Sequence, residues 1–132
     1  EKIASLDQEK IGIVMDYLFD IENKKIKAIS ECKEWFIKQF PDKEQLKSAL
    51  NVILLIYKDA LNYKLFNKML YFEDETGIKN ISETVLDGII IKKISCILDN
   101  INKLNYNVNI SLFMMNFLVE MGEISNDKSS RS

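Results

Sequence analysis

A scarcity of turn-forming residues constrains this chain more than any other feature of its sequence. Its 132 residues include one proline and four glycines, well below the average usage of about 5% and 7%. Sandwiches, barrels and disordered linkers all need more turn residues than this. Since 47% of the residues are hydrophobic, and a chain of this length can bury one core without metals or disulfides, the sequence predicts a single all-α domain.

Charge and residue usage argue against several classes of function. The net charge is −2 and the one arginine is Arg131, which disfavours a general nucleic-acid surface and sequence-specific DNA contact. The chain has no histidine, the usual general base near neutral pH. Its longest apolar run, residues 52–57, has six residues, whereas a membrane helix needs about 20. We therefore expect a cytoplasmic protein that does not enter a membrane.

No motif in the sequence indicates catalysis. The chain lacks a phosphate-binding loop, a dinucleotide-binding glycine pattern and an HExxH zinc motif. Two carboxylates facing each other across a cleft, as a glycosidase needs, are not displayed, because the acids mostly fall opposite the apolar stripes. Cys32 and Cys96 show no zinc-ligand spacing, and we expect two reduced, at least partly buried thiols. The sequence thus predicts no catalytic residue, no cofactor and no metal.

Apolar residues recur with helical spacing in five segments, which predicts a five-helix bundle. The predicted helices cover about residues 7–21, 23–40, 42–68, 82–104 and 110–122. Pro41 ends the second helix, since proline disfavours helical geometry in the residue before it, and Asp42 is a good N-cap for the third. The third helix is apolar on more than one side, so we expect it near the centre of the bundle.

Three further features complete the predicted organisation. An acidic segment at residues 71–80 should be a solvated loop, and Ser82 is the expected N-cap of the helix that follows it. Asp59 is the least ordinary acid because the third helix is largely apolar, and we expect a helix-surface ion pair or a capping role for it. The helical domain should span residues 1–122, followed by a polar, disordered tail at 123–132.

The connection between the last two predicted helices carries the most distinctive pattern, Asn107–Val108–Asn109. Asparagine tolerates left-handed geometry and caps helices, so two of them around one apolar residue can reverse the chain tightly, and we expect Asn109 to be the N-cap of the last helix. This turn and the helix after it resemble the C-terminal end of the delta-prime subunit family of the bacterial DNA polymerase III clamp loader. The matching residues are Asn107, Val108, Asn109, Leu112, Met114, Phe117, Leu118 and Met121. The Ser82–Glu83 helix start and the upstream helix carrying Trp35 are also similar to that family.

The resemblance implies a particular fold and role. In that family the last domain is a helical collar without ATP chemistry, and further domains precede it. The collar packs against the equivalent domains of the gamma/tau and delta subunits. The assembled loader places the sliding clamp on primed DNA for the polymerase III holoenzyme, a DNA-directed DNA polymerase. This chain would then be a non-catalytic assembly domain with five collar helices.

If the chain assembles in this way, exposed apolar side chains at helix ends should meet the neighbouring subunits, with acidic and lysine rims setting partner choice. We expect Tyr63, Phe66, Phe113 and Asn116 in this interface. An alternative is an unrelated small α-helical regulatory or ligand-binding protein, with a pocket among the methionine-rich last helix and its neighbours. An enzyme using carboxylates alone is a third possibility.

Overall fold

The computed structural model describes residues 8–24, 29–73 and 75–126. These residues form six α-helices and no strand. The helices are α1 (Gln8–Lys24), α2 (Ile29–Gln39), α3 (Lys43–Phe66), α4 (Thr76–Thr84), α5 (Asp87–Lys103) and α6 (Ile110–Ser125). The all-α prediction is confirmed, but the described part of the chain holds six helices where five were predicted. None of these six is long and apolar enough to cross a membrane.

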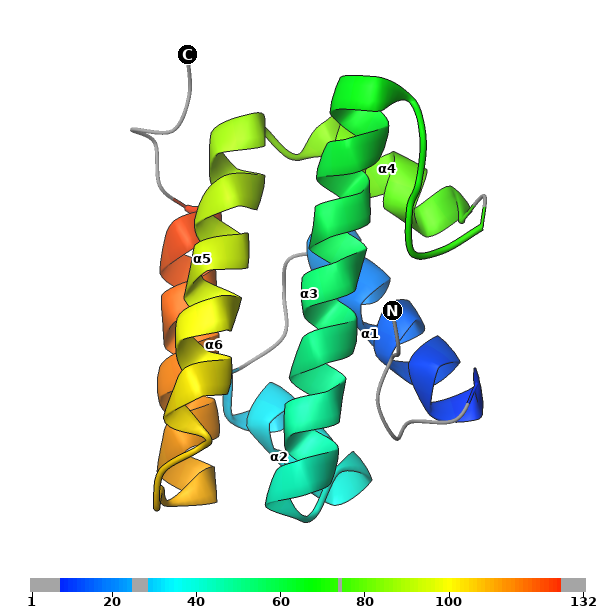
Figure 1. The fold of residues 1–132 in the computed structure, drawn as a ribbon. Coiled ribbons are helices and arrows are strands. Elements are labelled where there is room, and N and C mark those ends of the chain that lie inside the picture. Colours follow the sequence, from blue (N-terminus) through cyan, green and yellow to red (C-terminus); the bar gives the residue numbers. More distant parts are fainter. Residues whose placement is uncertain (1–7, 25–28, 74, 127–132) are drawn as a thin grey trace.

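Helix α3 is the central element of the bundle (Figure 1). Helices α5 and α6 run antiparallel on one side of it, and α1 and α4 lie on the other. The buried side chains of α3 include Leu46, Leu50, Ile53, Ile56 and Tyr57, each at most 2% exposed. Burial on several faces confirms the central position predicted from its apolar pattern.

Local signals set the two ends of α3. The Asp42 carboxylate accepts a hydrogen bond from the Gln45 backbone N–H at 2.8 Å, which confirms the predicted N-cap. At the other end Asn67 adopts left-handed geometry with φ of 57°, and its N–H donates to the Tyr63 carbonyl at 2.8 Å. A left-handed residue after the last turn is a common way to end a helix.

Helix α4 lies where a loop was predicted at residues 71–80. It has nine residues, and its buried Ile78 and Ile81 pack into the core. So short a helix shows too little periodicity to be recognised from sequence. The predicted N-cap role of Ser82 is wrong: this side chain is buried within α4, and its hydroxyl donates to the Lys79 carbonyl at 2.6 Å. The next helix, α5, begins only at Asp87.

A glycine allows the close approach of α4 to α1. A Cβ atom added at Gly77 would lie only 2.0 Å from the ring of Phe19. Real Cβ atoms essentially never approach another atom so closely. The absence of a side chain at position 77 therefore lets the first turn of α4 pack directly on α1.

Aromatic side chains pack α1 against α2. The rings of Tyr17 and Trp35 stack with their centroids 3.8 Å apart, and Phe36 meets both rings edge-on. Phe36 and Phe40 are almost fully buried. Burial, followed by the neighbouring Cys32, raises the pKa of the Tyr17 hydroxyl. This cluster is core packing rather than an exposed stacking surface.

A buried ion pair joins three helices. The Lys93 ammonium on α5 lies 2.6 Å from a carboxylate oxygen of Glu22 on α1, and Lys93 is 3% exposed. The hydroxyl of Tyr57 on α3 donates to the same oxygen, and the lysine nitrogen lies 5.3 Å from the centre of that ring. Burial first, and then Glu22, raises the pKa of Tyr57. Each charge thus has a partner that offsets part of its desolvation.

Helix α6 begins at the asparagine turn. The Asn109 side chain accepts a hydrogen bond from the Leu112 N–H at 2.9 Å, which confirms the predicted N-cap. Phe113 and Phe117 face the core, whereas Leu112 is 61% exposed. The helix continues to Ser125, beyond the predicted boundary at residue 122. The tail at 127–132 lies outside the described residues.

Candidate interaction surface

Four large apolar side chains are exposed at the end of the molecule where α3 stops. We call them the α3-end surface: Leu65 (56% exposed), Phe66 (71%), Leu70 (62%) and Leu86 (40%). Two belong to the last turn of α3, one to the segment after it, and one caps the start of α5. Several exposed apolar side chains on neighbouring segments are characteristic of a surface that binds another protein.

The buried carboxylate of Asp59 holds the segment that carries Leu70. Its oxygens accept hydrogen bonds from the backbone N–H groups of Leu70 at 2.7 Å, and of Tyr71 and Phe72 at 2.8 Å. Asn62 donates from its side chain at 3.1 Å, and Asp59 itself is 0% exposed. Hydrogen bonds to a charged acceptor are stronger than neutral ones. The expected helix-surface ion pair or helix cap is therefore wrong: Asp59 is buried, and it binds the backbone of a following segment that is not helical.

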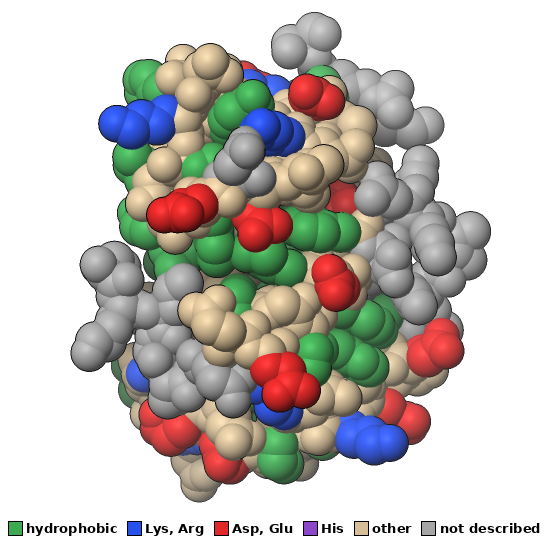
Figure 2. Space-filling model, turned by 90° about the vertical axis from the view of Figure 1, so that its right-hand side faces the viewer, with side chains coloured by type: hydrophobic (Ala, Val, Ile, Leu, Met, Phe, Trp, Pro, Cys, Tyr) green, Lys and Arg blue, Asp and Glu red, His purple; other side chains and the backbone are tan. Residues whose placement is uncertain are grey.

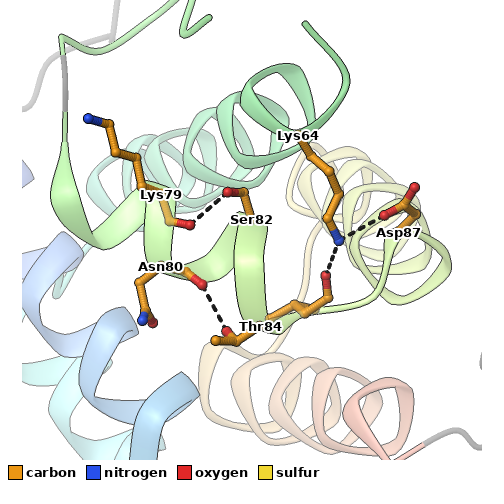
Figure 3. A network of polar contacts seen from close by, with 7 residues as sticks. Lys64, Lys79, Asn80, Ser82, Thr84 and Asp87 are labelled. Carbon is orange, nitrogen blue, oxygen red and sulfur yellow. Dashed lines mark hydrogen bonds and ion pairs between the residues drawn. The ribbon is translucent and has the colours of Figure 1, made fainter. Parts of the chain in front are cut away.

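A second charged side chain of α3 holds the turn between α4 and α5 (Figure 3). The Lys64 ammonium donates to the Val85 carbonyl at 2.6 Å and pairs with Asp87 at 2.8 Å. Within α4 the hydroxyl of Thr84 donates to the Asn80 carbonyl at 2.9 Å. Lys64 thus contacts the residues on both sides of Leu86, and these contacts fix the turn to α3.

A shallow hollow borders the α3-end surface. It has a volume of about 320 Å³ and lies between the end of α3 and the start of α4. Tyr63 and Phe72 line it, and the Lys79 nitrogen lies 5.6 Å from the centre of the Tyr63 ring. Over the side of the molecule that carries α1 and α4, hydrophobic surface lies between scattered charges of both signs (Figure 2).

The four residues expected in an interface do not form one surface. Phe66 is 71% exposed and Tyr63 is half-buried beside it. Asn116 is exposed near the middle of α6. The exposure expected for Phe113 is wrong, because this side chain is only 6% exposed and packs in the core. The end of α3 therefore brings together only Tyr63 and Phe66.

Methionines of α6 pack in the core of the described residues. Met114 is fully buried, and Met121 packs against the core. A groove of about 410 Å³ between α5 and α6 is lined by Cys96, Glu120 and their neighbours, but by no methionine of α6. The observed packing gives these methionines a structural role in the core.

The two cysteines are free, as expected. Cys32 is buried and Cys96 is half-buried. The side chain of Asn100 donates to the Glu120 carboxylate at 3.0 Å and to the Cys96 carbonyl at 2.8 Å. Burial, followed by Glu120, raises the pKa of the Cys96 thiol to about 11. A thiol that keeps its proton at neutral pH is a poor nucleophile, so the geometry disfavours thiol chemistry here.

These observations define an all-α domain whose exposed apolar side chains lie at the end of α3 and on segments that α3 side chains bind. No protein-family model, no curated protein and no solved structure matches this chain. Across residues 8–24, 29–73 and 75–126, no group of acids and cysteines is arranged to hold a metal ion. The α3-end surface is consequently the feature on which a function can be argued.

Proposed function

We propose that this chain is a non-catalytic assembly domain that binds another protein subunit through the α3-end surface. The observation that carries the proposal is the exposure of Leu65 and Phe66 in the last turn of α3 and of Leu70 on backbone held by Asp59. A few anchoring side chains supply most of the binding energy at protein interfaces, and aromatic residues such as Phe66 are enriched there. Their backbone is already ordered, which reduces the entropy lost on binding.

The resemblance of the C-terminal segment narrows this proposal to a collar domain of a clamp-loader delta-prime subunit. The partners would be the collar domains of gamma/tau and delta, in the cytoplasm, and the parent assembly would be the DNA polymerase III holoenzyme. An all-helical bundle with a capped Asn107–Asn109 turn supports this assignment. Tyr63 and Phe66 would contribute to one subunit contact, and Asn116 to another.

Binding to purified subunits tests the proposal. The chain is mixed with the gamma/tau and delta subunits of the same cell, and complexes are measured by size-exclusion chromatography with light scattering. We expect a stoichiometric complex. Phe66→Ser or Leu70→Ser should weaken it by at least about 2 kcal/mol, roughly 30-fold in Kd.

Leu98→Ser is the matched control, because Leu98 is an exposed leucine (43%) on α5, away from the α3-end surface and from Asn116. Its complex should keep the wild-type Kd. A complex equally sensitive to all three substitutions would refute the α3-end surface as the contact. A chain that binds neither subunit would contradict the clamp-loader assignment and favour an unrelated regulatory or ligand-binding protein.

A further inference from the structure

The turn between α5 and α6, at the opposite end of the molecule from the α3-end surface, is surrounded by lysines. Lys43 in the first turn of α3 donates from its ammonium to the Tyr106 carbonyl at 2.9 Å. One turn later Lys47 donates to the side-chain oxygen of Asn105 at 2.7 Å. These two contacts place both ammonium groups beside the same short turn.

Two more lysines flank this turn. Lys103 ends α5 and is exposed, and its carbonyl accepts a hydrogen bond from the Tyr106 N–H at 3.1 Å. On the other side, Lys33 of α2 donates to the Ser111 hydroxyl in the first turn of α6 at 3.2 Å. We call the four lysines and Tyr106 the lysine-ringed turn.

The lysines of this turn are not neutralised by acids. The acceptors contacted by Lys33, Lys43 and Lys47 are a hydroxyl, a carbonyl and an amide oxygen. Within the described part of the chain, none of the four ammonium groups forms an ion pair with a carboxylate. An ammonium has three protons to donate, so each retains donors for an added anion.

The acids that flank Lys43 in the sequence point elsewhere. Asp42 is engaged as the N-cap of α3 through the Gln45 N–H. Glu44 is displaced from Lys43 by about 100° around the helix, whereas Lys47 is displaced by only about 40°. Lys43 and Lys47 thus share a face of α3 that Glu44 does not share.

The same turn carries an exposed aromatic ring. Tyr106 is 72% exposed, the highest value among the large apolar side chains of the described residues. Its backbone is held on both sides, because its N–H bonds to the end of α5 and its carbonyl accepts from Lys43. The exposed ring is therefore presented on ordered backbone.

We propose that the lysine-ringed turn binds single-stranded nucleic acid without sequence preference. A base would stack on the ring of Tyr106, and the phosphates on either side of it would contact the lysines. Proteins that bind single strands combine aromatic stacking with a track of positive charge. A duplex keeps its bases stacked inside, so it offers phosphates but no free base to this ring.

The proposal is independent of the assembly function and uses a different end of the molecule. The net charge of −2 disfavours a nucleic-acid surface that covers the whole protein, but a local site depends on the charge beside the strand rather than on the total. The turn has no arginine, the residue that recognises guanine through two hydrogen bonds. Its lysines are better suited to weak contacts with phosphates.

Fluorescence anisotropy with the full chain tests the proposal. The probe is a labelled oligodeoxythymidylate of about 16 nucleotides, enough for one binding site of this type. In about 50 mM salt, where phosphate contacts are strong, we expect saturable binding that is tighter than binding of a duplex of the same length. Tyr106→Ser should weaken it about tenfold, the loss expected for one stacked base.

The lysines are tested separately through the salt dependence. The double variant Lys43→Gln/Lys47→Gln should lower the slope of log Kd against log salt by about 1.4, since each phosphate contact to a single strand contributes about 0.7. Lys43→Arg/Lys47→Arg keeps both charges and should retain the wild-type slope. If the glutamine variant disturbs the turn, Tyr106→Ser remains a test, because that ring is mostly exposed.

Phe66→Ser and Lys68→Gln, at the other end of α3, are the matched controls for the loss of a ring and of a charge. Both should bind the probe as the wild type does. The proposal is overturned if the probe does not bind in low salt, or if Tyr106→Ser binds as tightly as the wild type. It is also overturned if Lys68→Gln lowers the salt slope by half as much as Lys43→Gln/Lys47→Gln does.

Discussion

The substitution Asp59→Ala should release the segment that carries Leu70. In the wild type the buried carboxylate accepts three backbone N–H groups at 2.7–2.8 Å. Hydrogen bonds to a charged group contribute about 1.5–3 kcal/mol each. The variant has no carboxylate to remove from water on folding, which offsets part of this loss. The freed N–H groups can turn to water if the segment opens. We therefore expect a net loss of about 2–4 kcal/mol in the free energy of unfolding.

Asp59→Asn should be intermediate, for a geometric reason. One oxygen of the carboxylate serves Leu70 and Asn62, and the other serves Tyr71 and Phe72. An amide keeps only one oxygen, so its best orientation satisfies Tyr71 and Phe72 and turns its own N–H₂ toward the Leu70 N–H. Both donors to the replaced oxygen lose their acceptor. The half-buried Asn62 amide can turn to water, so the Leu70 N–H remains without a partner at a cost of about 1–3 kcal/mol.

Urea unfolding followed by circular dichroism measures these free energies, and hydrogen exchange locates the change. The amides of residues 70–72 should exchange faster in both variants, while those of the buried part of α3 stay protected. Asp16→Asn, at an exposed acid of α1, is the control and should stay within about 0.5 kcal/mol of the wild type. If Asp59→Ala is as stable as this control and its amides remain slow, the carboxylate does not hold the segment.

Two further predictions concern other buried groups. Lys93→Met leaves the Glu22 carboxylate without its cation and should lose about 3–5 kcal/mol in urea unfolding. Glu22→Leu/Lys93→Met removes both charges and should recover part of this loss, with about 1–3 kcal/mol remaining because the buried Tyr57 hydroxyl loses its acceptor. Equal stability of the single variant and the wild type would contradict this prediction. Iodoacetamide labelling of Cys96, followed by mass spectrometry, should accelerate only as the pH approaches about 11 rather than the usual 9.0. Glu120→Gln should lower that threshold only partly, since burial is the larger cause. Because the fold favours the protonated thiol, this group's stabilising contribution is present below pH 9.0 and is lost as the pH rises toward about 11. Labelling already at its plateau near pH 9.0 would refute the raised pKa.

The long helices and two of their caps could be predicted from the sequence because their signals are local. Asp42 follows the single proline, and its carboxylate meets a backbone N–H three residues later. Asn109 does the same at the start of α6. The capping contact involves only neighbouring residues and does not depend on how the helices pack.

Helix α4 could not be predicted because packing decides it. Its core contacts come from Ile78 and Ile81, which lie only three residues apart. An acidic run precedes them and favours a loop by composition. The close contact of Gly77 with α1 and the buried Ser82 are visible only once the other helices are in place.

The buried charged residues also differ in how well the sequence predicts them. Asp59 stands out in the sequence as an acid in an apolar helix, but its partners lie 11 to 13 residues later in a segment without periodicity. Lys93 gave a usable signal that was missed, since it lies three residues after Ile90 and four before Ile97 on the buried stripe of α5. Its partner Glu22 lies 71 residues away.

The scarcity of glycine and proline and the charged side chains of α3 are connected. A turn without proline has no residue that fixes φ, and a turn without glycine rarely adopts tight left-handed geometry, so contacts from elsewhere must hold its conformation. In this protein α3 supplies the missing constraint: Asp59 and Lys64 hold the connections at one end, and Lys43 and Lys47 hold the turn at the other. The most exposed rings, Phe66 and Tyr106, lie at these two ends. A central helix that orders its neighbours' connections can therefore present two separate binding surfaces at little entropic cost.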